Sequence, residues 1–308
     1  MTEPAPSTAP NLARRYLDPA VVSTLSSLHL KARLVVEGFI SGLHKSPYHG
    51  FSVEFVEHRP YMPGDPLRNV DWKVYAKSDR FYVKQYEDET NLRAYLILDR
   101  SASMGYRSQG AKVSKLEYAQ TLAAALAYLL LGQQDAAGFL SFAEGVDGFV
   151  PPRAAKGHLE TLLRELDRAR PGGRTALGAT LHDLAERMKR RGLVILFSDL
   201  MADPAEVLSG LKHFRHRRHE VIVFHILDPA EWASGFRDSA TFVDLETGEE
   251  VALEPWQVQA RYQDALRAWV DRYQRECGQQ QMDYVRLLTD VPYDVALLRY
   301  LEKRRRLY

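Results

Sequence analysis

From Leu92 onward, short apolar segments that are typical of buried strands alternate with longer segments of helical periodicity. The expected strands are Ala94–Leu98, Ala136–Phe142, Val146–Pro152, Leu193–Phe197, Glu220–Leu227 and Asp283–Thr289. The expected helices are Lys115–Gly132, Lys156–Ala169, Thr175–Gly192, Asp203–Arg217, Gln257–Cys277 and a last one from Tyr293. Strands interleaved with helices in this way predict an α/β fold, with an open, mostly parallel sheet and helices on both faces.

The regions around this pattern suggest three parts. Residues 1–13, which begin with a stretch rich in Pro, Ser and Thr, are expected to form a disordered tail. Residues 14–91 are expected to form an amino-terminal extension, with a helix from Asp18 to about Phe39 and alternating strands at Phe51–His58 and Arg80–Glu89. Residues 92–308 are expected to form the α/β domain, which ends with a hairpin at Ala240–Pro255 and further helices.

Charge and cysteine content argue against several classes of protein. Lys and Arg together number 41 and Asp and Glu 40, so the strong basic excess of a nucleic-acid or membrane-surface binder is missing. A single cysteine, Cys277, allows no internal disulfide. The longest apolar run, Leu122–Leu131, is about half of the roughly 20 residues that a membrane-spanning helix needs. We therefore expect a cytoplasmic protein without a membrane span and without a nucleic-acid partner.

Oxygen-bearing side chains follow two of the expected strands and precede one of the expected helices. Asp99, Ser101 and Ser103 come directly after the first buried strand, and Asp199 follows the strand Leu193–Phe197. Thr175 lies at the start of a helix, after a loop that contains Pro and Gly. In an open α/β sheet these loops converge at the carboxyl ends of the strands. The five side chains are therefore expected to meet at that edge.

Carboxylates and hydroxyls are hard oxygen ligands, and no His or Cys accompanies them, so the set favours one Mg²⁺, Mn²⁺ or Ca²⁺ ion over zinc or copper. Two carboxylates cancel the charge of a dication, while three hydroxyls add ligands without adding charge. A metal held in this way remains able to accept a carboxylate from outside the protein.

The order Asp-x-Ser-x-Ser, then a distant Thr, then a distant Asp resembles the metal-ion-dependent adhesion site of von Willebrand factor A domains. The stretch from Pro63 to Glu89 is similar to the signature of the domain of unknown function 58 (DUF58) family, and the resemblance extends over most of the chain, from Arg14 to Leu307.

This resemblance implies a von Willebrand factor A-like fold and places the metal ligands at Asp99, Ser101, Ser103, Thr175 and Asp199. It also implies a protein partner, because members of the family are often encoded beside MoxR-type AAA+ ATPases. The partner would be such an ATPase or its client, and an acidic side chain from it would complete the metal shell.

Each of these residues also has an ordinary structural interpretation. Asp99, Ser101 and Ser103 could form a capped loop, Thr175 could be only an N-cap, and Asp199 could cap the next helix, although Asp203 is better placed for that. At Arg68, Asp71 and Trp72 a structural role is favoured, in which charged side chains form an ion pair and the indole is packed. The segment His213–His219 is interpreted as a solvated basic helix end.

Three functions remain open from the sequence. The first is a metal-dependent binding module that acts as an adaptor or assembly factor. The second is a Mg²⁺-dependent hydrolase like the haloacid dehalogenase-type phosphatases, which need a second Asp where this chain has Ser101. The third is a structural subunit with an unused metal site. The absence of a second Asp makes the non-enzymatic binding module the preferred hypothesis.

Overall fold

The computed structural model describes residues 17–43, 58–60, 75, 81–84, 92–155, 157–233, 240–253 and 255–307. Within these ranges the largest sheet has six strands in the order β10-β7-β6-β3-β4-β5. Their bounds are β3 Arg93–Asp99, β4 Ala136–Phe142, β5 Val146–Arg153, β6 Leu193–Ser198, β7 Glu220–Leu227 and β10 Asp283–Leu288. All neighbouring pairs are parallel except β4 and β5, which are consecutive in the chain and antiparallel.

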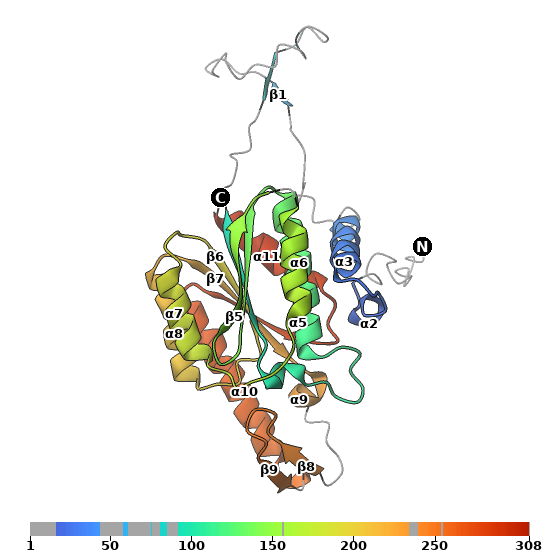
Figure 1. Ribbon diagram of the computed structural model, residues 1–308, viewed down its shortest axis with the longest axis vertical. Helices are drawn as coiled ribbons and strands as arrows, with labels where there is room; N and C mark the ends of the chain where they lie inside the picture. Colours follow the sequence, from blue (N-terminus) through green and yellow to red (C-terminus); the bar gives the residue numbers. More distant parts are fainter. Residues whose placement is uncertain are drawn as a thin grey trace, which may run out of the picture.

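Helices cover both faces of this sheet (Figure 1). On one face, α5 Lys115–Gly132, α6 His158–Arg168 and α11 Asp294–Leu307 pack against the sheet, and α3 Leu28–Leu43 packs on α5. The other face packs against α7 Leu177–Arg187, α8 Pro204–His216 and α10 Pro255–Gln279. Within β3, Leu96 and Leu98 belong to the first core and Ile97 to the second, because successive strand residues point to opposite faces.

The predicted fold class is confirmed. The sheet is open and mostly parallel, it has helices on both faces, and the arrangement is consistent with a von Willebrand factor A-like fold. Helix α5 is buried almost all round, as expected from its apolar sequence, since it packs against the sheet and against the helices α3 and α6. Within the described ranges, no helix has both the length and the apolar character that crossing a bilayer requires.

The amino-terminal helix differs from its prediction. The expected single helix from Asp18 to Phe39 is two helices, α2 Pro19–Val22 and α3, with Asp18 as the N-cap of the first. The side chains of Ser23 and Thr24 bond to the carbonyls of the preceding turn, at 2.9 and 2.7 Å. Such bonds offer the backbone an alternative to a continuous helix, and they explain the break.

Only part of the predicted β extension can be compared with the structure. Strands β1 His58–Pro60 and β2 Tyr82–Lys84 pair antiparallel. Apart from Phe81, the other residues of both predicted strands lie outside the described residues. The same holds for the tail of residues 1–13 and for the signature residues Arg68, Asp71 and Trp72. The predicted carboxy-terminal hairpin is confirmed as β8 Ala240–Val243 and β9 Glu250–Leu253, with Gly248 in its loop at a φ of 75°.

The strand order defines where a site can form. From β3 the chain proceeds to β4 on one side, whereas β6, β7 and β10 add to the other side of β3. The connections that leave the carboxyl ends of β3 and β6 therefore diverge. A crevice at such a switch point is where open α/β sheets bind ligands.

Candidate metal centre

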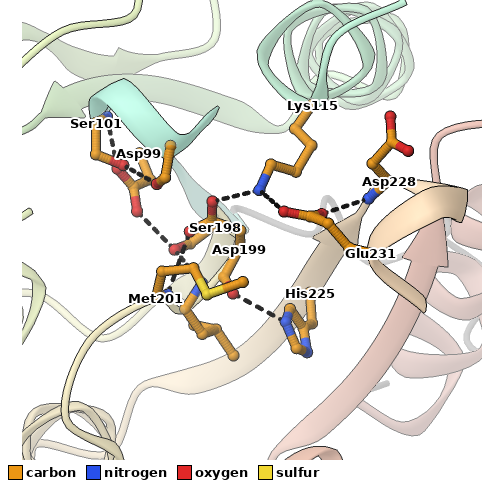
Figure 2. A network of polar contacts seen from close by, with 11 residues as sticks. Asp99, Ser101, Lys115, Ser198, Asp199, Met201, His225, Asp228 and Glu231 are labelled. Carbon is orange, nitrogen blue, oxygen red and sulfur yellow. Dashed lines mark hydrogen bonds and ion pairs between the residues drawn. The ribbon is translucent and has the colours of Figure 1, made fainter. Parts of the chain in front are cut away.

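Asp99 and Asp199 lie at this switch point, and Ser198 joins their two strands (Figure 2). The parallel register pairs Leu98 with Phe197, which brings Asp99, the last residue of β3, beside Ser198. The Ser198 hydroxyl donates to Asp99 Oδ2 at 2.6 Å and accepts from the backbone N–H of Leu200 at 2.9 Å. Ser198 therefore orients Asp99, a structural role that sequence analysis did not assign to it.

Ser101 and Ser103 connect the two carboxylates. The backbone N–H of Ser101 donates to Asp99 Oδ1 at 2.9 Å, and the hydroxyls of Ser101 and Ser103 are 3.0 Å apart. The Ser103 hydroxyl also hydrogen-bonds to the Asp199 carboxylate. A short 3₁₀ helix, η2 Ala102–Gly105, turns the chain after β3 and allows these contacts. Four of the five predicted ligands therefore form one hydrogen-bonded network.

Thr175, the fifth predicted ligand, lies in a loop held against the one that follows β3. The N–H of Gly172 donates to the Arg100 carbonyl at 2.9 Å, and the N–H of Ala102 donates to the Gly173 carbonyl at 3.0 Å. Helix α7 begins at Leu177 with Ala176 at its N-cap, so the helix starts later than predicted and Thr175 is not its cap. Within the described residues, the buried Thr175 Oγ1 has no hydrogen-bond partner.

Lys115 and Glu231 extend the network, and sequence analysis did not identify either of them. The Lys115 ammonium is 2.8 Å from Asp199 Oδ2 and 2.8 Å from Glu231 Oε1, and its side chain is 1% exposed (Figure 2). Glu231 belongs to the short helix α9 Pro229–Ala233, where it also accepts a hydrogen bond from the N–H of Asp228.

The position of Lys115 at the start of its helix could have identified it from the sequence as a member of the network. It is the first residue of α5, directly after the N-cap Ser114. The amino end of a helix favours negative charge, so a cation at this position needs an anionic partner from elsewhere in the fold. Asp199 and Glu231 provide that partner.

The pKa values of the two carboxylates at the centre, Asp99 and Asp199, are shifted in opposite directions. Burial, and then the negative charge of Asp199, raise the pKa of Asp99 to about 7. Burial alone would raise the pKa of Asp199 as well, but the charge and hydrogen bond of Lys115 outweigh it and lower that pKa. Asp199 is therefore ionised at neutral pH, whereas Asp99 is poised between its two forms.

His225 contacts the network at the Asp199 carbonyl and is unable to act as a base. Its Nε2 is 2.9 Å from the Asp199 carbonyl and therefore carries the proton, since a carbonyl only accepts. The other ring nitrogen, Nδ1, accepts from the Tyr284 hydroxyl. Burial lowers the pKa of His225 to about 3, so the ring is neutral and both of its nitrogens are engaged.

Two of the structural alternatives are resolved by the geometry. The Asp203 carboxylate accepts from the N–H of Ala205 at 2.6 Å and caps α8, so Asp199 is not needed as that cap. The predicted solvated basic helix end at His213–His219 is exposed only in part. His219 is buried with its ring against the Met188 carbonyl, and the His213 ring contacts that of His182, because α7 packs against α8.

The donor set fits a hard divalent cation. When all are ionised, the carboxylates of Asp99, Asp199 and Glu231 and the ammonium of Lys115 sum to a charge of −2, which a dication would neutralise. Within the described ranges, no group of three or more His, Cys, Asp or Glu side chains has a metal-binding arrangement. A cation here would therefore depend on hydroxyl ligands such as Thr175 Oγ1 as well as on carboxylates.

Comparison with solved structures finds matches of low sequence identity. The conserved hypothetical protein BatB from Bacteroides thetaiotaomicron is 17% identical, with a TM-score of 0.48 over 70% of this chain and 99% of that chain. An aerotolerance-related membrane protein from Bacteroides fragilis is 16% identical, with a TM-score of 0.43 over 67% of this chain and 94% of that chain.

Comparison with sequences finds closer relatives. An uncharacterized protein of Mycobacterium bovis is 30% identical over 317 residues, which covers 99% of this chain and 98% of the relative. A Mycobacterium tuberculosis protein, also uncharacterized, matches with the same values. The model of the family described as "Protein of unknown function DUF58" matches residues 57–272. These matches show that the chain belongs to the DUF58 family.

Proposed function

We propose that this protein is a metal-dependent protein-binding module, which works as an adaptor or assembly factor with a MoxR-type AAA+ ATPase or its client. The observation that carries the proposal is the hydrogen-bonded network of Asp99, Ser101, Ser103 and Asp199 at the switch point of the sheet. The adjacent Thr175 contributes a buried hydroxyl that has no partner among the described residues. These five residues would hold Mg²⁺, Mn²⁺ or Ca²⁺.

The charge of the centre supports a role in binding. The surrounding protein groups balance a dication without excess negative charge, so the bound metal remains attractive to one further carboxylate. An acidic side chain of the partner would supply it and complete the shell. Such a contact gives specificity, although desolvation of both charges offsets much of the gain in affinity.

The surroundings of Asp99 favour binding over hydrolysis. A phosphatase of the haloacid dehalogenase type needs an acid–base carboxyl two residues after its nucleophile, and that position is occupied by Ser101. The nearby His225 is neutral and hydrogen-bonded at both nitrogens, so it has no free site to accept a proton.

The function is tested by binding to a co-encoded MoxR-type ATPase, with calorimetry in Mg²⁺ and then in EDTA. We expect chelation to abolish the interaction and Ser101→Ala to have the same effect, because both remove the metal contact. His216→Ala, on an exposed turn of α8, is the control and should bind normally. Undiminished binding in EDTA would contradict the proposal and would direct attention to the signature residues around Arg68 and Trp72.

A further inference from the structure

The hairpin of β8 and β9 contacts the candidate metal centre through its loop. Glu246 lies in that loop, and its Oε2 accepts a hydrogen bond of 3.0 Å from the backbone N–H of Thr175, 71 residues away in the sequence. The hairpin lies below the main sheet in Figure 1, beside the start of α10. The chain therefore places one of its own carboxylates next to a predicted metal ligand.

The same two residues each have a buried oxygen without a hydrogen-bond partner in the described part of the chain. These oxygens are Thr175 Oγ1 and Glu246 Oε1. Buried polar atoms are nearly always satisfied in folded proteins, so a pair of unsatisfied oxygens on adjoining residues indicates a missing ligand. A hydroxyl and a carboxylate oxygen are both ligands that a hard cation prefers. One cation bound by both oxygens would satisfy them together.

Further interactions hold the hairpin loop in this place. Asp244 Oδ1 accepts from the N–H groups of Glu246 and Thr247, at 2.7 and 3.2 Å, which fixes the shape of the loop. These hydrogen bonds, and to a smaller extent the charge of Arg174, lower the pKa of Asp244. The neighbouring residues Arg174 and Thr175 therefore both interact with the hairpin loop, one through charge and one through a hydrogen bond.

We infer that Glu246 is an internal acidic ligand of the metal centre and occupies the position that a partner's acidic side chain would take. This inference rests on the proposed function and adds a means of regulation to it. The centre without Glu246 has a charge of −2 when ionised, so a bound dication leaves room for one further carboxylate and disfavours a second. An acidic partner must therefore displace Glu246, and with it the hairpin loop.

A purely structural role for Glu246 makes a different prediction. If its carboxylate only anchors the N–H of Thr175, then Glu246→Gln, whose amide oxygen also accepts that hydrogen bond, leaves metal binding unchanged. Glu249→Gln is the matched control, because Glu249 is an exposed carboxylate of the same hairpin.

The test uses Mn²⁺ alone as the probe, followed by the relaxation of water protons on the bound ion. We expect Glu246→Gln to weaken Mn²⁺ binding about tenfold. Glu246→Ala should raise the relaxation enhancement, because water takes the vacated position. Acetate should lower the enhancement again in Glu246→Ala and have little effect in the parent protein, where Glu246 holds that position.

The outcomes separate this inference from the proposed function. Equal Mn²⁺ affinity and relaxation in Glu246→Gln and Glu249→Gln would overturn the role of Glu246 and leave the metal centre intact. Mn²⁺ binding that is absent from the parent, or unchanged by Asp99→Ala, would overturn both.

Discussion

The two halves of the candidate centre contain chemically identical carboxylates in contrasting environments. Asp199 is paired with the buried ammonium of Lys115, and its pKa is lowered. Among the described residues, Asp99 accepts from the uncharged donors Ser198 and Ser101, and its pKa is raised to about 7. Asp199 therefore already has a cationic partner from the protein, whereas Asp99 has none and would gain more from a bound cation. If the proposed cation binds here, we therefore expect it to be held mainly from the side of Asp99 and Thr175.

Removal of the ammonium from the Asp199 half should have the largest effect. Lys115→Met leaves the buried carboxylates of Asp199 and Glu231 without compensation, and it should lower the free energy of unfolding by about 3–5 kcal/mol. Urea unfolding measures this loss, with the exposed Lys112→Met as the control. The double variant Lys115→Met with Glu231→Gln should recover part of it. A loss below about 1 kcal/mol would show that the ion pair does not stabilise this half.

Metal addition should stabilise the folded protein through the half of the centre that contains Asp99 and Thr175. Saturating Mg²⁺ or Mn²⁺ should stabilise the parent by about 2.7 kcal/mol at one hundred times Kd, because the ion binds only the folded state. Asp99→Ala and Thr175→Val each remove a ligand and should abolish the shift in Tm, whereas His216→Ala should keep it. Thermal unfolding with and without metal provides the measurement. An unchanged shift in Asp99→Ala would place the metal elsewhere.

The raised pKa of Asp99 predicts a smaller, pH-dependent effect in metal-free protein. The folded state holds this proton up to about pH 7, whereas the unfolded chain releases it near pH 4, so the stabilisation is present below pH 4 and is lost as the pH rises through 7. Relative to Asp99→Asn, the parent should lose about 2 kcal/mol between pH 5.5 and 7. Chemical unfolding at both pH values tests this. Equal slopes for parent and variant would mean that Asp99 is ionised throughout.

The helices and strands, and the edge of the sheet at which their polar residues meet, follow from patterns in the sequence alone. Alternating apolar strands and amphipathic helices specify a covered, mostly parallel sheet, and residues that follow such strands lie at its carboxyl edge. Asp99, Ser101, Ser103 and Asp199 could therefore be placed together before the structure was known. The break between α2 and α3 was missed because it depends on local side-chain hydrogen bonds that apolar periodicity does not register.

The groups that surround that cluster are brought there by tertiary packing. Lys115 contacts Asp199 and Glu231, which are 84 and 116 residues away in the sequence, and Glu246 contacts Thr175, which is 71 residues away. None of these pairs has a local sequence pattern, because the contacts depend on how helix, loop and hairpin pack rather than on spacing along the chain. The same packing buries the carboxylates, and burial together with neighbouring charge gives Asp99 and Asp199 their different pKa values.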